Sequence, residues 1–124
     1  MKKNLRYIYL KYSHHFYNIK KNIFVVTNFW EGADEIAQGK IAIQAAKDLL
    51  KKGNINPLEI DLVIMATATP DMLVASTGVY VASQIGATNA FSYDLQAACS
   101  SFLFGMSTAA AYIESGRYKK ILLI

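Results

Sequence analysis

The stretch at residues 60–68, IDLVIMATA, decides how this chain is predicted to fold. It is short and almost continuously apolar, which is typical of a strand buried on both faces, as in a parallel sheet. The breakers Thr69 and Pro70 follow it directly. Residues 91–95 and the apolar run at 119–124 are predicted to be further strands.

The segment before this stretch has a helical pattern. Ile36, Ile43 and Leu50 belong to a set of apolar and small residues spaced by three or four positions, which places them on one helical face. Asp34 lies where the first turn of a helix favours acidic residues, and Gly53 is a natural stop. We therefore expect a helix from about residue 33 to residue 53.

Two more helices are predicted between the strands. The first spans residues 76–85, with Ser76 or Thr77 as its N-cap and Gly86 after its end. The second spans residues 99–115 and also stops at a glycine. Helices that alternate with strands indicate an α/β domain with a largely parallel sheet.

Charge divides the 124-residue chain in two, although its length allows only one domain. Residues 1–30 hold six of the 13 basic residues and no acidic one, so residues 31–124 carry seven basic against nine acidic residues. We treat residues 1–30 as a divergent basic segment, either foreign to the domain or an ordinary β-hairpin, with a possible short strand at residues 23–26. Residues 31–124 form the domain.

Several classes of protein are disfavoured by the composition. The domain lacks the basic excess that nucleic-acid binding needs. No apolar run is long enough to span a membrane, and charged residues interrupt the first 20 positions where a signal peptide would be apolar. A single cysteine excludes an internal disulfide and a Cys-rich metal site, which fits the cytoplasm.

That single cysteine, Cys99, is the candidate catalytic residue. It lies between the predicted strand at 91–95 and an Ala-rich helix, so its thiol is placed near a helix N-terminus. The dipole and free N–H groups there stabilise a thiolate and can bind a developing oxyanion. The simpler alternative is that Cys99 is a small buried hydrophobic residue.

The surrounding residues resemble the β-ketoacyl-[acyl-carrier-protein] synthase III family. The similar motifs are residues 89–102 (NAFSYDLQAACSSF), residues 61–71 (DLVIMATATPD) and residues 114–120 (ESGRYKK). The resemblance covers about residues 31–124. It implies the N-terminal half of a thiolase-like fold, with helices packed on a mostly parallel mixed sheet, and a fold that is incomplete and continues past Ile124.

The resemblance also implies an activity, that of an acyltransferase of fatty-acid biosynthesis. Cys99 would accept an acyl group from acyl-CoA, with its own backbone N–H in the oxyanion hole. Decarboxylation of malonyl-carrier protein would then allow condensation to a β-ketoacyl product. The implied partners are acyl-CoA, acyl carrier protein and a second copy of the chain in a homodimer, with residues 91–95 near the seam. No metal or cofactor is implied.

The sequence departs from the family at several positions. Nothing matches the family's catalytic histidine and asparagine, and His14 and His15 lie outside the resemblance. The surroundings of Trp30 do not reproduce the family's CoA-contacting motif. Ser101 replaces a usual glycine, which adds a side chain where the helix packs closely. Val74 replaces a larger aromatic residue in a loop that borders the acyl pocket, which predicts a roomier pocket.

Two other functions stay open from the sequence. The chain could belong to another thiolase-superfamily condensing enzyme, or it could be a non-catalytic remnant. Under every one of these interpretations, the missing histidine and asparagine predict little or no net condensation by these 124 residues alone.

Overall fold

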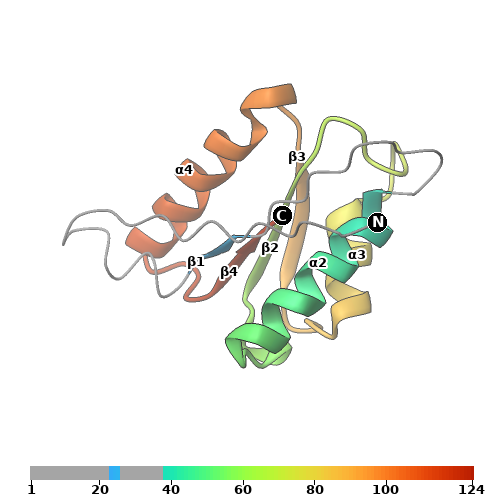
Figure 1. The fold of residues 1–124 in the computed structure, drawn as a ribbon. Helices are drawn as coiled ribbons and strands as arrows, with labels where there is room; N and C mark the ends of the chain where they lie inside the picture. The colour runs from blue at the N-terminus through green and yellow to red at the C-terminus, as the bar shows by residue number, and fades with distance from the viewer. Residues whose placement is uncertain (1–22, 26–37) are drawn as a thin grey trace.

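A parallel sheet is the centre of the computed structural model, which describes residues 23–25 and 38–124 (Figure 1). Its strands are β1 (Ile23–Val25), β2 (Leu62–Ala66), β3 (Phe91–Leu95) and β4 (Ile121–Leu123), in the spatial order β1-β4-β2-β3. All three pairings are parallel. The predicted α/β class with a parallel sheet is therefore confirmed.

Within the described residues, three helices cover the two faces of the sheet. Helices α2 (Gln38–Gly53) and α3 (Thr77–Ile85) lie on one face, and α4 (Ser101–Glu114) lies on the other (Figure 1). Two short 3-10 turns, Pro57–Glu59 and Ala98–Ser100, precede β2 and α4. Because consecutive parallel strands need a crossover, α3 and α4 follow from the strand pattern.

The ends of the predicted elements shift by a few residues. The central strand is shorter than residues 60–68, and the predicted start of the first helix, with Asp34 and Ile36, lies outside the described residues. Ser76 is the N-cap of α3, with Oγ accepting from the Val79 amide at 3.3 Å. Gly86 ends α3 in the left-handed region, at φ 83°. Both predicted caps are confirmed.

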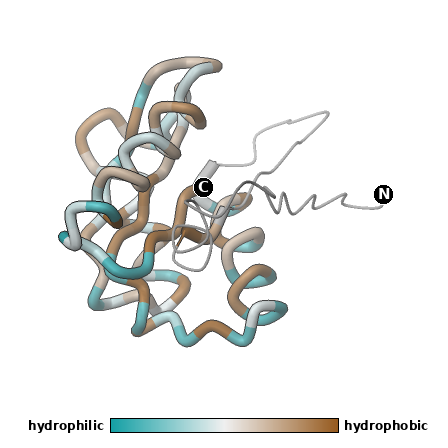
Figure 2. Tube along the Cα trace, turned by 90° about the vertical axis from the view of Figure 1, so that its left-hand side faces the viewer, coloured by the Kyte–Doolittle hydropathy of each residue, from teal (hydrophilic) through white to brown (hydrophobic). Residues whose placement is uncertain are grey.

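Two apolar clusters hold the layers together. Val63 and Met65 of β2 face α2 and α3, whereas Leu62 and Ile64 face α4. All four are almost completely buried, so β2 is covered on both faces as predicted. Figure 2 shows hydrophobic strand segments between helices that alternate between hydrophilic and hydrophobic positions.

Helix α4 lies unusually close to the sheet. The residues of α4 that are buried are all small: Ser101, Gly105 and Ala109. A Cβ added at Gly105 would be 2.6 Å from Cδ1 of Leu123 in β4, which is below any normal contact. This close approach holds α4 against β4, directly after the turn that contains Cys99.

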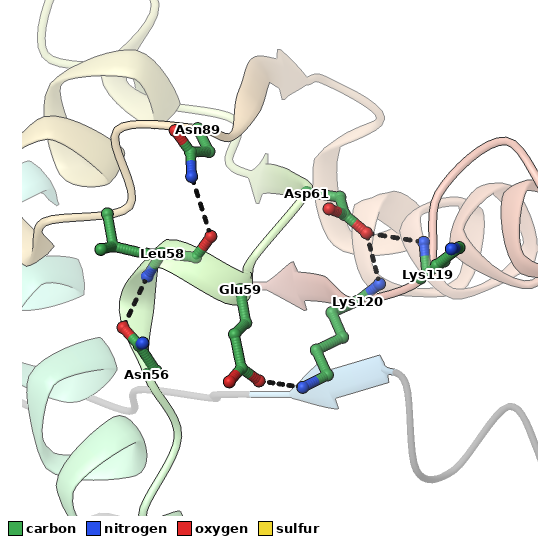
Figure 3. A network of polar contacts seen from close by, with 7 residues as sticks. All are labelled: Asn56, Leu58, Glu59, Asp61, Asn89, Lys119 and Lys120. Atoms are coloured by element: carbon green, nitrogen blue, oxygen red, sulfur yellow. Dashed lines mark hydrogen bonds and ion pairs between the residues drawn. The ribbon is translucent and has the colours of Figure 1, made fainter.

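Polar contacts connect the amino ends of β2 and β4, at the edge of the sheet opposite to Cys99 (Figure 3). Oδ2 of Asp61 accepts hydrogen bonds from the amides of Lys119 at 2.8 Å and Lys120 at 3.0 Å. The Lys120 ammonium also pairs with the Glu59 carboxylate. These bonds set the register of the two central strands, so the strand ends near Cys99 stay aligned.

The described part of the basic N-terminal segment is strand β1. Residues 23–25 pair in parallel with β4, and Ile23 is buried. A short strand in this part of the chain is therefore confirmed. The remaining residues of the segment, with His14, His15 and Trp30, lie outside the described residues.

Candidate active site

Cys99 lies in a tight turn between β3 and α4, which we call the cysteine turn (residues 96–101). The turn includes the 3-10 segment Ala98–Ser100, so α4 begins at Ser101 and not at Cys99 as predicted. Ala98 has a φ of 47°, in the left-handed region that a residue with a Cβ seldom occupies. Backbone strain of this kind is concentrated at functional sites, because the surroundings must enforce it.

The thiol and the amide of Cys99 are both available. Cys99 is a free cysteine and is exposed, which is inconsistent with the alternative of a small buried hydrophobic residue. Among the residues that the structure describes, its backbone N–H makes no hydrogen bond. An exposed thiol beside a free amide at a helix start is the arrangement that thioester attack requires, since the amide can bind the oxyanion.

Ser101 fits the close packing of α4 and adds a bond to the turn. Its Oγ accepts a hydrogen bond from the Ala97 amide at 2.8 Å. The backbone of the same turn is closed by a bond from the Ser100 amide to the Ala97 carbonyl at 3.0 Å. The additional side chain at residue 101 is thus accommodated inside the turn.

Asp94 ties the strand before Cys99 to the start of α3. Its Oδ1 accepts from the Gly78 amide at 2.7 Å and from Ser76 Oγ at 2.8 Å, and its Oδ2 accepts from the Thr77 amide at 2.8 Å. A carboxylate at a helix N-terminus satisfies free N–H groups and complements the helix dipole. The strand leading to Cys99 is therefore held from the side of α3 as well.

A second carboxylate extends this connection to α2. The amide of Asp71 donates to Oγ1 of the buried Thr77 at 3.1 Å, and its Oδ2 accepts from the Gly39 amide at 2.8 Å. Both bonds anchor the loop that connects β2 to α3. Residues in the middle of this loop point into solvent: Leu73 and Val74 are each 99% exposed.

Val74 lies in the loop between β2 and α3, with its side chain in solvent. Its loop follows the carboxyl end of β2, at the same edge of the sheet as the cysteine turn. Its side chain lies against no pocket wall within the described residues. The acyl-pocket role of Val74 stays a prediction.

Metal-binding clusters and membrane-spanning helices are both absent from the described ranges, 23–25 and 38–124. These ranges contain no group of three or more His, Cys, Asp or Glu side chains that could hold a metal ion. No helix there is long and apolar enough to cross a membrane.

Sequence reasoning did not find the roles of Asp94 and Ser101. Asp94 was recognisable as a charge near the end of a strand, but its three donors are at least 16 positions away in the chain. Ser101 was recognised only as a departure from glycine. A serine four residues after a turn amide was the available signal for a side-chain bond that closes the turn.

The described part of the chain has a thiolase-like fold. The structure of 3-oxoacyl-[acyl-carrier-protein] synthase III from Aquifex aeolicus VF5 is similar, with a TM-score of 0.70 and 38% identity over 73% of this chain and 30% of that one. Xanthomonas campestris OleA, solved with lauric acid and lauroyl-CoA, has a TM-score of 0.68 and 27% identity, covering 79% of this chain and 29% of its own.

Sequence comparison gives the family. The profile of 3-oxoacyl-[acyl-carrier-protein (ACP)] synthase III matches residues 93–124. The β-ketoacyl-[acyl-carrier-protein] synthase III 2 of Bacteroides thetaiotaomicron is 54% identical over 84 residues, which are 68% of this chain and 25% of the relative. The chain belongs to the β-ketoacyl-[acyl-carrier-protein] synthase III family, and it spans about a quarter of the length of the curated relatives it matches.

Proposed function

We propose that this chain carries the acyl-accepting cysteine of a β-ketoacyl-[acyl-carrier-protein] synthase III of fatty-acid biosynthesis. The observation that carries the proposal is that Cys99 is exposed and directly follows Ala98, whose backbone is in the left-handed region. The family relationship gives this turn a chemical task, the transfer of an acyl group from acyl-CoA.

In the proposed first step the Cys99 thiolate attacks the thioester carbonyl of acyl-CoA. The free Cys99 amide donates to the oxygen while it carries negative charge. The carbon–sulfur bond to CoA then breaks, CoA leaves as a thiolate that takes up a proton, and the acyl group stays on Cys99 as a thioester. Covalent catalysis of this kind divides one difficult reaction into two easier ones.

In the proposed second step malonyl-carrier protein loses carbon dioxide, and the carbanion attacks the acyl thioester and releases Cys99. This step needs groups that polarise the malonyl carbonyl, a task of histidine and asparagine in the family. No histidine is present in residues 38–124. We therefore propose that these 124 residues alone accept an acyl group but condense little or none of it.

A labelling experiment in two stages tests the proposal. The chain is first incubated with radiolabelled acetyl-CoA and then with malonyl-carrier protein. We expect label on Cys99 after the first stage and no β-ketoacyl product after the second. If iodoacetamide and acetyl-CoA both leave Cys99 unmodified near neutral pH, the chain is a non-catalytic remnant; a full β-ketoacyl product would refute the limit to the first step.

The same proposal includes a homodimer, with β3 at the seam. β3 is at the end of the strand order, paired only with β2 among the described strands, and Phe91 is 63% exposed. An unpaired edge with an exposed aromatic residue favours strand pairing with a second copy. Sedimentation of the wild-type chain and of Phe91→Lys tests this: the variant is expected to dissociate at concentrations where the wild type is dimeric.

Another condensing enzyme is the second candidate, because OleA, solved with lauroyl-CoA, shares the fold. The acceptor separates the two candidates. A synthase III takes malonate bound to carrier protein, whereas a hydroxymethylglutaryl-CoA-type synthase takes free acyl-CoA. We propose that the reaction takes place in the cytoplasm, which the single free thiol supports. We also propose that it uses no metal or cofactor, because the chemistry proposed for Cys99 needs none.

A further inference from the structure

Ser101 is the residue of the cysteine turn that differs from the family pattern, and its side chain has a defined partner. It is 3% exposed, and its Oγ accepts from the Ala97 amide at 2.8 Å. The bond connects the residue before the left-handed Ala98 to the first residue of α4. This hydrogen bond thus bridges the two ends of the segment that contains the strained Ala98.

The backbone bonds of the turn are arranged around this side-chain bond. Ser100 donates to the Ala97 carbonyl at 3.0 Å, and Ser101 donates to the Ala98 carbonyl. These bonds close the turn on the carbonyl side of Ala97, while Ser101 Oγ holds its amide. The amide and the carbonyl of Ala97 are therefore both held, and the Cys99 amide, two residues later, has no acceptor among the described residues.

We propose that Ser101 is a positioning residue for Cys99: its hydroxyl holds Ala97, and through the strained Ala98 it fixes the direction of the Cys99 amide and thiol. The inference rests on the proposed function of Cys99 as acyl acceptor. Ser101 itself touches no reacting atom. A left-handed Ala98 without this restraint would relax toward the commoner backbone regions, which turns the Cys99 amide away from the oxyanion.

Three variants of the full 124-residue chain test the proposal. Ser101→Ala removes the acceptor, and Ser101→Gly removes it with the residue usual in the family. Ser107→Ala is the matched control, because Ser107 is an exposed serine of the same helix. Each variant is assayed for acetylation by acetyl-CoA, alkylation by iodoacetamide and hydrogen exchange of the Ala97 amide.

We expect the maximal acetylation rate of both Ser101 variants to fall by about fivefold to tenfold, the effect of one lost hydrogen bond. The half-saturating acetyl-CoA concentration and the alkylation rate should change by less than about twofold, since only the charged transition state needs the amide. A purely structural defect would instead change acetylation and alkylation together. The Ala97 amide should exchange faster in both Ser101 variants and at the wild-type rate in Ser107→Ala.

The outcomes separate this inference from the proposed function. If the wild-type chain is acetylated and both Ser101 variants are acetylated at the wild-type rate, Ser101 has no positioning role and the proposed function stands. If the wild-type chain is not acetylated, the proposed function fails. In that case unchanged Ala97 exchange in Ser101→Ala overturns the restraint as well, and faster exchange retains it as a feature of the turn.

Discussion

The amide of Gly78 lies 2.7 Å from Oδ1 of Asp94, so the strand that leads to Cys99 is bonded to the first turn of α3. The carboxylate also accepts from Thr77 and from Ser76 Oγ. The position of the cysteine turn thus depends on a contact between β3 and α3, the latter on the opposite face of the sheet from α4. This relationship gives the first prediction.

Replacing Asp94 by alanine should lower the free energy of unfolding by about 2–4 kcal/mol, because donors at the start of α3 lose a charged acceptor. Urea denaturation followed by circular dichroism measures the change. Asp48→Ala is the control: Asp48 accepts one exposed bond from Gln44, so its loss should cost less than about 0.5 kcal/mol. Equal stability of Asp94→Ala and wild type would show that the cap is unimportant.

Gly105→Ala tests the close approach of α4. The added Cβ would be 2.6 Å from Cδ1 of the fully buried Leu123. Overpacking costs about 1–3 kcal/mol, and the better helix propensity of alanine returns at most about 1 kcal/mol, so we expect a net loss of roughly 1 kcal/mol.

The same substitution made in a Leu123→Ala background provides the control. There the obstructing methyl groups are absent, and Gly105→Ala should be neutral or stabilising. A destabilisation of the same size in both backgrounds would mean that Leu123 is not the reason for glycine at this position.

Tyr93 predicts a loss of stability at alkaline pH. Burial, and next the nearby Tyr112 phenol, raise the pKa of Tyr93 from 10.0 to about 12. The folded state favours the neutral phenol. The contribution of Tyr93 to the free energy of unfolding is therefore fully present below pH 10.0 and is lost as the pH rises toward about 12.

Tyr93→Phe should remove this alkaline dependence. Its hydroxyl is buried beside the Tyr112 phenol and makes no well-formed hydrogen bond in the described part of the chain, so the change should alter stability at pH 7 only slightly. Unfolding measured across this alkaline range compares the two proteins. An identical pH dependence in wild type and variant would contradict the assignment to Tyr93.

Val74 gives a prediction about primer length. Its side chain is 99% exposed, so Val74→Phe should leave the stability of this chain within about 0.5 kcal/mol. In an intact relative with valine at this position, the same change should lower acylation by longer acyl-CoA relative to acetyl-CoA. An unchanged ratio would remove Val74 from the acyl pocket.

The sheet was predictable because its central strand is apolar on both faces. The short, continuous apolar run at residues 60–68 is typical of a strand covered on both faces. Gly86 marked the end of α3. The helix before β2 was also predictable from its spacing. The local pattern did not show that Ala98 would be left-handed, because nothing in a run of two alanines encodes a positive φ.

The candidate site was only partly predictable for a similar reason. Cys99 was found from its place between a strand and a helix. The contacts of Asp94 with α3 are tertiary, and a sequence pattern with local periodicity contains no information on them. Ser101 was expected to add a side chain where α4 packs closely, and the structure accommodates its hydroxyl as an acceptor within the turn.

The most direct test of the account is the intact mass of the chain after incubation with acetyl-CoA, with the modified peptide identified by fragmentation. The account predicts one added acetyl group on Cys99, its removal by hydroxylamine, and none in Cys99→Ala. A folded wild-type chain that stays unmodified, or acetylation elsewhere that persists in Cys99→Ala, would contradict the claim that Cys99 is the acyl acceptor.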